Sequence, residues 1–204
     1  SKEDKTETIP YPFECLNTKT LGMRRGELVT ITSGTGQGKS QLCRQIAHHL
    51  LKNKESVGYI ALEESVKRSA LGIMGIDLQK PLHLSKDGVN KDEFRNSFNA
   101  TVGSGLLYLF DHFGSHDSMG LLSKIRYLAK GLGVRWIILD HLSIVISGLE
   151  SFDERKLIDV TMTKLRSLVE ETGIGLFVVN HLRRPEGNKG YEDGLQTSLN
   201  SLRG

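Results

Sequence analysis

The stretch Leu28-Val-Thr-Ile-Thr-Ser-Gly-Thr-Gly-Gln-Gly-Lys39-Ser40 contains the strongest structural signal in this sequence of 204 residues. Its β-branched run at 29–32 predicts a short buried strand, and the alternating glycines that follow predict a loop. Beyond Ser40, apolar residues recur at helical spacing from Leu42 to Leu51, which predicts an amphipathic helix. A strand, a glycine-rich loop, a Lys-Ser pair and a helix in this order are the pattern of a phosphate-binding P-loop.

The P-loop predicts that the chain binds a nucleoside triphosphate together with Mg²⁺. Glycines let backbone amides curl around phosphate oxygens, and the start of the helix adds partial positive charge at the same place. Lys39 is expected to act in catalysis by contacting the β- and γ-phosphates, and the Ser40 hydroxyl is expected to bind Mg²⁺. The expected nucleotide-binding residues are Ser33, Gly34, Thr35, Gly36, Gln37, Gly38, Lys39, Ser40 and Gln41.

Ser33 departs from the usual P-loop pattern, which has a glycine five places before Gly38. The alternative is a glycine-rich turn between a strand and a helix that binds no ligand. Gly-Lys-Ser with a strand before it and a helix after it favours the nucleotide site.

The composition indicates one globular α/β domain, because the hydrophobic content of 38% and charged content of 25% are ordinary for such proteins. The net charge of +3 permits a nucleic-acid partner without requiring one. The two cysteines lie in unrelated contexts and predict neither a disulfide framework nor a zinc site. No apolar run has membrane-spanning length and the polar start is no signal peptide, so a cytoplasmic location is expected.

Residues 1–10 are charged and are expected to form a tail or the end of a linker, with the folded core at 11–204. Four further strands are expected, at 57–62, 106–110, 136–140 and 175–180. Helices are expected between them, with a surface excursion at 75–90 and a mobile loop at 182–204. This alternation predicts an α/β fold with a mainly parallel twisted sheet flanked by helices on both faces.

Asp140 ends the apolar strand Trp136-Ile-Ile-Leu-Asp140, which is the arrangement called Walker B. An apolar strand that ends in aspartate is common, but the P-loop upstream gives this one a specific role. Asp140 is expected to hold Mg²⁺ through its water shell, opposite Ser40.

Glu63 is the candidate for the group that deprotonates the attacking water. It lies at the carboxyl end of the second expected strand, where ligands bind in open parallel sheets. Glu64 is the second candidate, and the alternative is that both are solvated acids at the start of a helix.

His181 closes the last expected strand at the same edge of the sheet, where its imidazole is expected to contact the γ-phosphate. For His141, directly after Asp140, orientation of ligands and a plain loop position remain equally open. His112 and His116 have the spacing of metal ligands, but no third ligand lies near them in the sequence, so a metal site is not expected there.

Basic residues follow the last strand at Arg183, Arg184 and Lys189, with glycines between them, and Arg155 follows the Walker B segment. Cations on flexible glycine-containing loops suit contact with a nucleic-acid backbone, and the scarcity of aromatic residues argues against base stacking. The alternative is ordinary solvated charge.

With these residues assembled, the chain resembles the helicase half of phage replicative primase–helicases. These are RecA-type hexameric helicases related to bacterial DnaB and mitochondrial Twinkle. The similarity runs from about Leu21 to the last residue. It rests on the segments Thr20-Leu-Gly-Met23, Ser33-Gly-Thr-Gly-Gln-Gly-Lys-Ser40, Leu62-Glu-Glu-Ser-Val66, Ile138-Leu-Asp-His-Leu-Ser-Ile-Val145, Asp153-Glu-Arg-Lys156, Met162-Thr-Lys-Leu165, His181-Leu182 and Leu202-Arg-Gly204.

The resemblance implies a RecA-like P-loop NTPase in which the last strand lies between the Walker A and Walker B strands. It implies NTP-driven 5′-to-3′ translocation on single-stranded DNA, with ATP or dTTP as the fuel, and unwinding of duplex DNA at the replication fork. It assigns DNA contacts to Arg183, to Lys189 and, in a second loop, to Arg155. It also implies a hexameric ring in the host cytoplasm, with a fused primase domain and a replicative DNA polymerase as candidate partners.

The chain ends at Gly204, where relatives continue into further strands and an arginine that acts on a neighbouring subunit. A fragment that assembles poorly and hydrolyses NTP slowly is therefore expected, since that arginine supplies much of the rate. Two other functions stay open: a RecA-type recombinase that forms filaments on DNA, and an NTP-binding regulatory module without motor activity.

Overall fold

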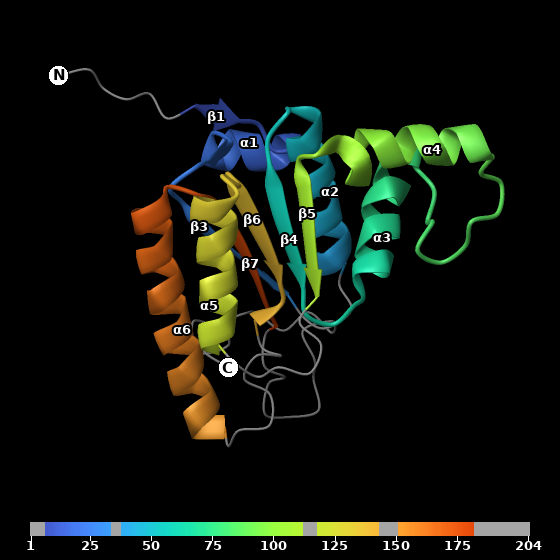
Figure 1. Ribbon diagram of the computed structural model, residues 1–204. Helices are drawn as coiled ribbons and strands as arrows, with labels where there is room; N and C mark the ends of the chain where they lie inside the picture. The colour runs from blue at the N-terminus through green and yellow to red at the C-terminus, as the bar shows by residue number, and fades with distance from the viewer. Residues whose placement is uncertain (1–6, 34–37, 112–117, 143–150, 182–204) are drawn as a thin grey trace.

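A computed structural model of the protein describes residues 7–33, 38–111, 118–142 and 151–181. A five-stranded parallel sheet forms its centre, in the order β3-β7-β6-β4-β5 (Figure 1). The strands are β3 (Leu28–Ser33), β4 (Val57–Ala61), β5 (Leu107–Asp111), β6 (Trp136–Asp140) and β7 (Gly175–His181). A separate antiparallel pair joins β1 (Thr8–Ile9) to β2 (Met23–Arg24).

Helices cover both faces of the sheet, with α5 and α6 on one side and α2 and α3 on the other (Figure 1). Their bounds are α1 (Glu14–Thr20), α2 (Lys39–Lys52), α3 (Val66–Leu78), α4 (Lys91–Ala100), α5 (Ser118–Arg126) and α6 (Ser151–Thr172). A 3₁₀ turn, η1 (Val102–Ser104), follows α4, and α5 continues into the π-helical segment η2 (Tyr127–Gly131). The predicted α/β fold with a parallel sheet between two helical layers is confirmed.

The sheet is buried on both faces, because side chains alternate between two hydrophobic clusters along each strand. In β6, Trp136 and Ile138 join the cluster that contains α2, while Ile137 and Leu139 join the cluster that contains α5 and α6. Phe177 of β7 stacks on Trp136 with the ring centroids 6.2 Å apart. The near-continuous apolar sequence of β6 reflects this burial.

Sequence-based bounds of the inner strands agree with the structure to within a residue, but two expectations at surface segments are wrong. Thr8 and Ile9 do not belong to a tail, since they pair with β2 and Ile9 is buried. The surface excursion expected from Gly75 begins only after Leu78, because α3 continues with a buried Gly75 in its last turn. Ser65 caps α3 as expected, accepting a hydrogen bond from the backbone N–H of Arg68.

Strand order positions the candidate site. Because all five strands are parallel, their carboxyl ends lie at one edge, where the chain leaves β3, β4, β6 and β7 toward the residues singled out by the sequence. β7 lies between β3 and β6, as the family resemblance implied. Register places Asp140 beside Ala61, and the N–H of Leu62 donates to the carbonyl of Asp140 at 2.7 Å. The described helices include none long and apolar enough to cross a membrane.

Candidate nucleotide-binding site

The P-loop helix α2 begins at Lys39, directly after Gly38. Gly38 has a positive φ of 75°, a left-handed conformation that glycine adopts without the steric cost of a Cβ. This residue turns the chain into α2 so that the first amides of the helix face the carboxyl edge of the sheet. Lys39 is buried there, and burial lowers the pKa of its ammonium group, an effect that the nearby carboxylates of Asp140 and Glu63 oppose.

Ser40 and Asp140 meet at this edge. The Ser40 Oγ donates a hydrogen bond to Asp140 Oδ2 at 2.7 Å, joining the first turn of α2 to the end of β6. Burial would raise the pKa of Asp140, but hydrogen bonds from His141 and Ser40 outweigh it and hold the pKa below its ordinary value. The carboxylate therefore stays ionised in its buried position.

The hydroxyl and carboxylate fit the chemistry of Mg²⁺, which prefers oxygen ligands and keeps several waters. Mg²⁺ in NTP sites takes only one or two protein ligands, with phosphates and water completing its shell. The described residues accordingly include no cluster of three or more His, Cys, Asp or Glu side chains suited to hold a metal by themselves. A site formed by one serine and one aspartate requires the nucleotide to bring the remaining ligands.

Glu63 lies beyond the end of β4 with its side chain 61% exposed. Its Oε1 is 3.2 Å from Nε2 of His141, and Nδ1 of the same ring is 3.7 Å from Asp140 Oδ1. The buried imidazole thus lies between the two carboxylates. Of the two roles left open for His141, this position favours orientation of the acidic side chains over a plain loop position.

Glu64 is turned away from its neighbour and into the protein. Its carboxylate accepts hydrogen bonds from Arg44 Nη2 and from the Ser69 hydroxyl. A carboxylate held in this way is poorly suited to accept a proton from water, so the geometry favours Glu63 over Glu64 as the base.

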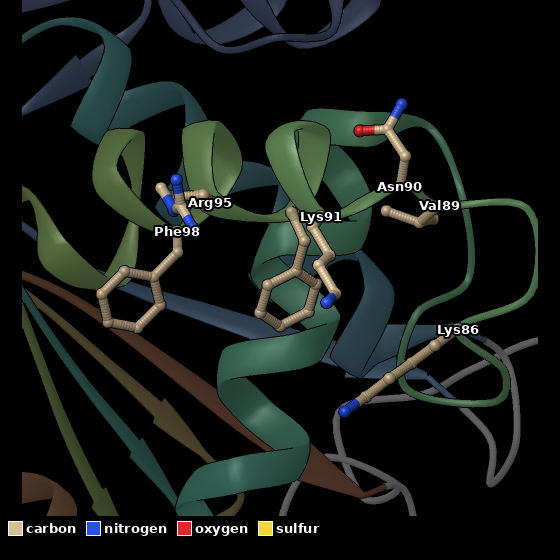
Figure 2. Close-up of a pocket in the computed structure, with 7 residues that line it drawn as sticks. Lys86, Val89, Asn90, Lys91, Arg95 and Phe98 are labelled. Carbon is tan, nitrogen blue, oxygen red and sulfur yellow. The ribbon is translucent and has the colours of Figure 1, made fainter.

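A cavity of about 460 Å³ connects these groups and is lined by Ser40, Glu63, Glu64, Ser65, Arg68 and Asp140. A second cavity of about 500 Å³ lies on α4 and the segment before it, where Lys86, Lys91 and Arg95 surround apolar lining that includes Phe98 (Figure 2). α4 lies near the end of the sheet opposite the carboxyl ends of the strands (Figure 1). The smaller cavity is the one that contains the candidate chemistry.

Other residues proposed from the sequence are placed only in part. Gln41 lies exposed in the first turn of α2 and lines a separate cavity between α2 and α3. Ser33 pairs with His181 across β3 and β7, which brings the backbone of His181 beside the start of the P-loop. The backbone of Arg155 lies near the start of α6.

The remaining proposed residues lie outside the part of the chain that the structure describes. They are Gly34, Thr35, Gly36 and Gln37 of the P-loop, the DNA-binding candidates Arg183 and Lys189, and the histidines His112 and His116. The same holds for the side chains of Ser33, Arg155 and His181. Their roles stay predictions.

A parallel sheet in this order, with a P-loop serine bonded to an aspartate at the end of β6, defines a RecA-like P-loop fold. Within that class, the chain belongs to the family described as "DnaB-like helicase C terminal domain", whose model matches residues 8–194.

Three further similarities agree with this family. The chain is 41% identical over its whole length to a DNA helicase/primase of Enterobacteria phage T3, covering 37% of that protein. It is 20% identical to the replicative DNA helicase DnaB of Leifsonia xyli, over 90% of this chain and 41% of that protein. A solved ATPase domain matches 98% of this chain and 72% of its own, with a TM-score of 0.72 and 20% identity, which supports the fold. The chain thus spans about two fifths of the length of these two curated relatives.

Sequence reasoning missed the residues that surround the acids. Arg44 received no role, although it occupies the apolar stripe of α2 with Ala47 and Leu51 at helical spacing. A charged side chain at a position that the periodicity predicts to be buried was the available signal. No comparable signal marks the contact between His141 and Glu63, because it depends on how β4 and β6 pair.

Proposed function

We propose that this chain is the NTP-hydrolysing motor domain of a ring-shaped replicative DNA helicase. One observation carries the proposal: the Ser40–Asp140 hydrogen bond and the exposed Glu63 carboxylate border the same cavity at the carboxyl edge of the sheet. Membership of the DnaB-like helicase family supports it. The T3 relative is described as a DNA helicase/primase, which supports a role in phage DNA replication.

The chemical roles follow from the positions of the side chains. Lys39 supplies a positive charge to the β- and γ-phosphates of ATP or dTTP, and Ser40 and Asp140 hold Mg²⁺, directly and through water respectively. When bound, Mg²⁺ neutralises charge that develops on the phosphate oxygens. Glu63 orients the attacking water and accepts its proton, and His141 restrains the Glu63 carboxylate. His181 contacts the γ-phosphate from the end of β7.

The motor proposal extends to DNA and to neighbouring subunits. Arg183, Lys189 and Arg155 contact the backbone of single-stranded DNA, which moves 5′ to 3′ through a hexameric ring. Nucleotide lies between subunits, and an arginine from the neighbour stabilises the transition state. The protein acts in the cytoplasm of the host cell, with a primase domain and a replicative DNA polymerase as partners.

The experiment that tests the proposal measures NTP hydrolysis by the full-length protein with and without single-stranded DNA. Stimulation by DNA, lost in the Glu63→Gln variant, is the expected result. No stimulation would favour a regulatory NTP-binding module instead. Electron microscopy then distinguishes closed rings from the filaments of a recombinase, and forked substrates with one 5′ or one 3′ tail report the direction of movement.

A further inference from the structure

The two consecutive acids after β4 have opposite environments. The Glu63 side chain is 61% exposed, whereas the side chain of Glu64 is only 14% exposed and points toward α2 and α3. The backbone between them is a single peptide, with the Cα atoms about 3.8 Å apart. Whatever fixes Glu64 therefore also limits where the Glu63 carboxylate can lie.

Arg44 and Ser69 hold Glu64 from two different helices. Nη2 of Arg44, on α2, donates to Oε2 at 2.8 Å and to Oε1 at 3.1 Å. The Ser69 hydroxyl, on α3, donates to Oε1 at 2.9 Å. The connection between β4 and α3 is thereby tied to α2, the helix whose first turn carries Lys39 and Ser40.

The protein leaves a fitted space for the Arg44 side chain, which is 6% exposed. Gly72 of α3 lies against it, and a Cβ there would overlap Arg44 Nε and come within 2.6 Å of its Cζ. Any larger residue at 72 would displace the guanidinium. A buried ion pair gives little net stability, because the cost of removing two charges from water offsets their attraction. The benefit that remains is a defined geometry.

We propose that Arg44 is a positioning residue for Glu63. Its contact with Glu64 fixes the backbone after β4 relative to the P-loop helix, so that the Glu63 carboxylate stays at a set distance from Ser40 and Asp140. This inference rests on the proposed function and on the role of Glu63 within it. A misplacement of about 1 Å, caused by a mutation away from the reacting atoms, can cost about 10²-fold in rate.

The test uses the Arg44→Met variant of the full-length protein, with NTP turnover and nucleotide affinity measured separately. The kcat is expected to fall by roughly 10- to 100-fold. The affinity for a fluorescent Mg–nucleotide is expected to stay within about twofold, since the contacts to the phosphates are unchanged. Arg126→Met is the matched control, because Arg126 also pairs with a glutamate, Glu171, but is 51% exposed and lies on α5. The control is expected to keep full turnover.

A double-mutant cycle separates positioning from a general loss of structure. In the E63Q background, Arg44→Met is expected to cause no further loss of the residual turnover, because Arg44 acts through Glu63. Equal losses in both backgrounds would overturn the proposal. So would a folded Arg44→Met protein with unchanged kcat, or one that loses nucleotide affinity while kcat persists.

Glu64→Gln serves if Arg44→Met does not fold, because it keeps the size of the side chain while removing the charge that Arg44 binds. A fall in kcat without a fall in affinity is again expected, and full turnover would overturn the proposal. These outcomes differ from failure of the proposed function, in which the wild-type protein itself would show no NTP turnover stimulated by DNA.

Discussion

Ser40 and Asp140, which are 100 residues apart in the chain, are joined by a hydrogen bond of 2.7 Å between Oγ and Oδ2. Neither residue could be placed by its neighbours in sequence alone, since one begins a helix and the other ends a strand two positions away from β3 in the sheet. Their contact brings the hydroxyl and the carboxylate that suit Mg²⁺ to the same point. The first prediction concerns this pair.

Ser40→Ala removes the hydroxyl and should weaken Mg²⁺-dependent nucleotide binding by at least about tenfold. That is the lower end of the losses caused by removing even the outer partners of a metal. Titration of a fluorescent nucleotide with and without EDTA measures the effect. The wild type should lose affinity when the metal is removed, and Ser40→Ala should already be insensitive. Ser40→Thr keeps a hydroxyl and is the control; if it behaves like alanine, the hydroxyl is not the metal ligand.

Glu63→Gln should bind Mg–NTP with normal affinity but lose turnover by about 10²- to 10⁴-fold, the range for a missing general base. The amide cannot accept the proton of the attacking water. Single-turnover hydrolysis measures the loss. Glu64→Gln should keep more turnover than Glu63→Gln, because Glu64 faces Arg44 and Ser69. The reverse order would assign the base to Glu64.

Arg183→Ala combined with Lys189→Ala should weaken single-stranded DNA binding and leave nucleotide affinity unchanged. Each lost phosphate contact should also reduce the slope of log affinity against log salt by about 0.7. Fluorescence anisotropy at several salt concentrations measures both effects. Lys130→Ala, an exposed lysine paired with Glu171 at the end of the α5 segment, is the control. An unchanged salt slope would show that the two candidate residues do not contact the DNA backbone.

Gly175→Ala should destabilise the fold by roughly 1–3 kcal/mol, the usual cost of overpacking a core. A Cβ at Gly175 would overlap the ring of Trp136, and that ring is held between β7 and its stacked partner Phe177. Urea unfolding measures the change. Val160→Ala, at an exposed position on α6, should stay within about 0.5 kcal/mol of the wild type. Equal stability of Gly175→Ala and wild type would contradict the close packing of these two strands.

The cysteines should differ in reactivity. Cys43 is fully buried on α2, and burial raises the pKa of its thiol well above the ordinary value, so little thiolate forms. Cys15 is exposed on α1. A thiol reagent should therefore modify Cys15 rapidly and Cys43 only after unfolding. Cys15→Ser should abolish the rapid phase, and rapid labelling that persists in this variant would place Cys43 outside the core.

Much of the fold could be predicted because its central strands are decided locally. Trp136–Asp140 is apolar without alternation, which indicates a strand covered on both faces, and the structure gives those bounds. The P-loop helix could be predicted for the same reason, since glycines, Lys-Ser and apolar spacing all agree. The antiparallel pairing of Thr8–Ile9 with β2 could not, because a two-residue strand has no periodicity to detect.

The candidate site divides in the same way. Lys39, Ser40 and Asp140 belong to short patterns in which neighbouring residues identify each other. The roles of Glu63 and Glu64 could be ranked from sequence but not explained, because the difference lies in Arg44, 20 residues upstream of Glu64 on another element. Which acid faces the cavity depends on the packing of α2 against α3, and no local pattern contains that information.

The most direct test of the central claim is a structure of the full-length protein with a non-hydrolysable triphosphate and Mn²⁺ in place of Mg²⁺. We predict an anomalous signal from Mn²⁺ beside Ser40 Oγ, with Asp140 in its water shell, Lys39 at the β- and γ-phosphates, and Glu63 facing the γ-phosphate. A triphosphate bound elsewhere, or bound at the P-loop with Asp140 and Glu63 turned away from it, would contradict the claim that these residues form one site for NTP hydrolysis.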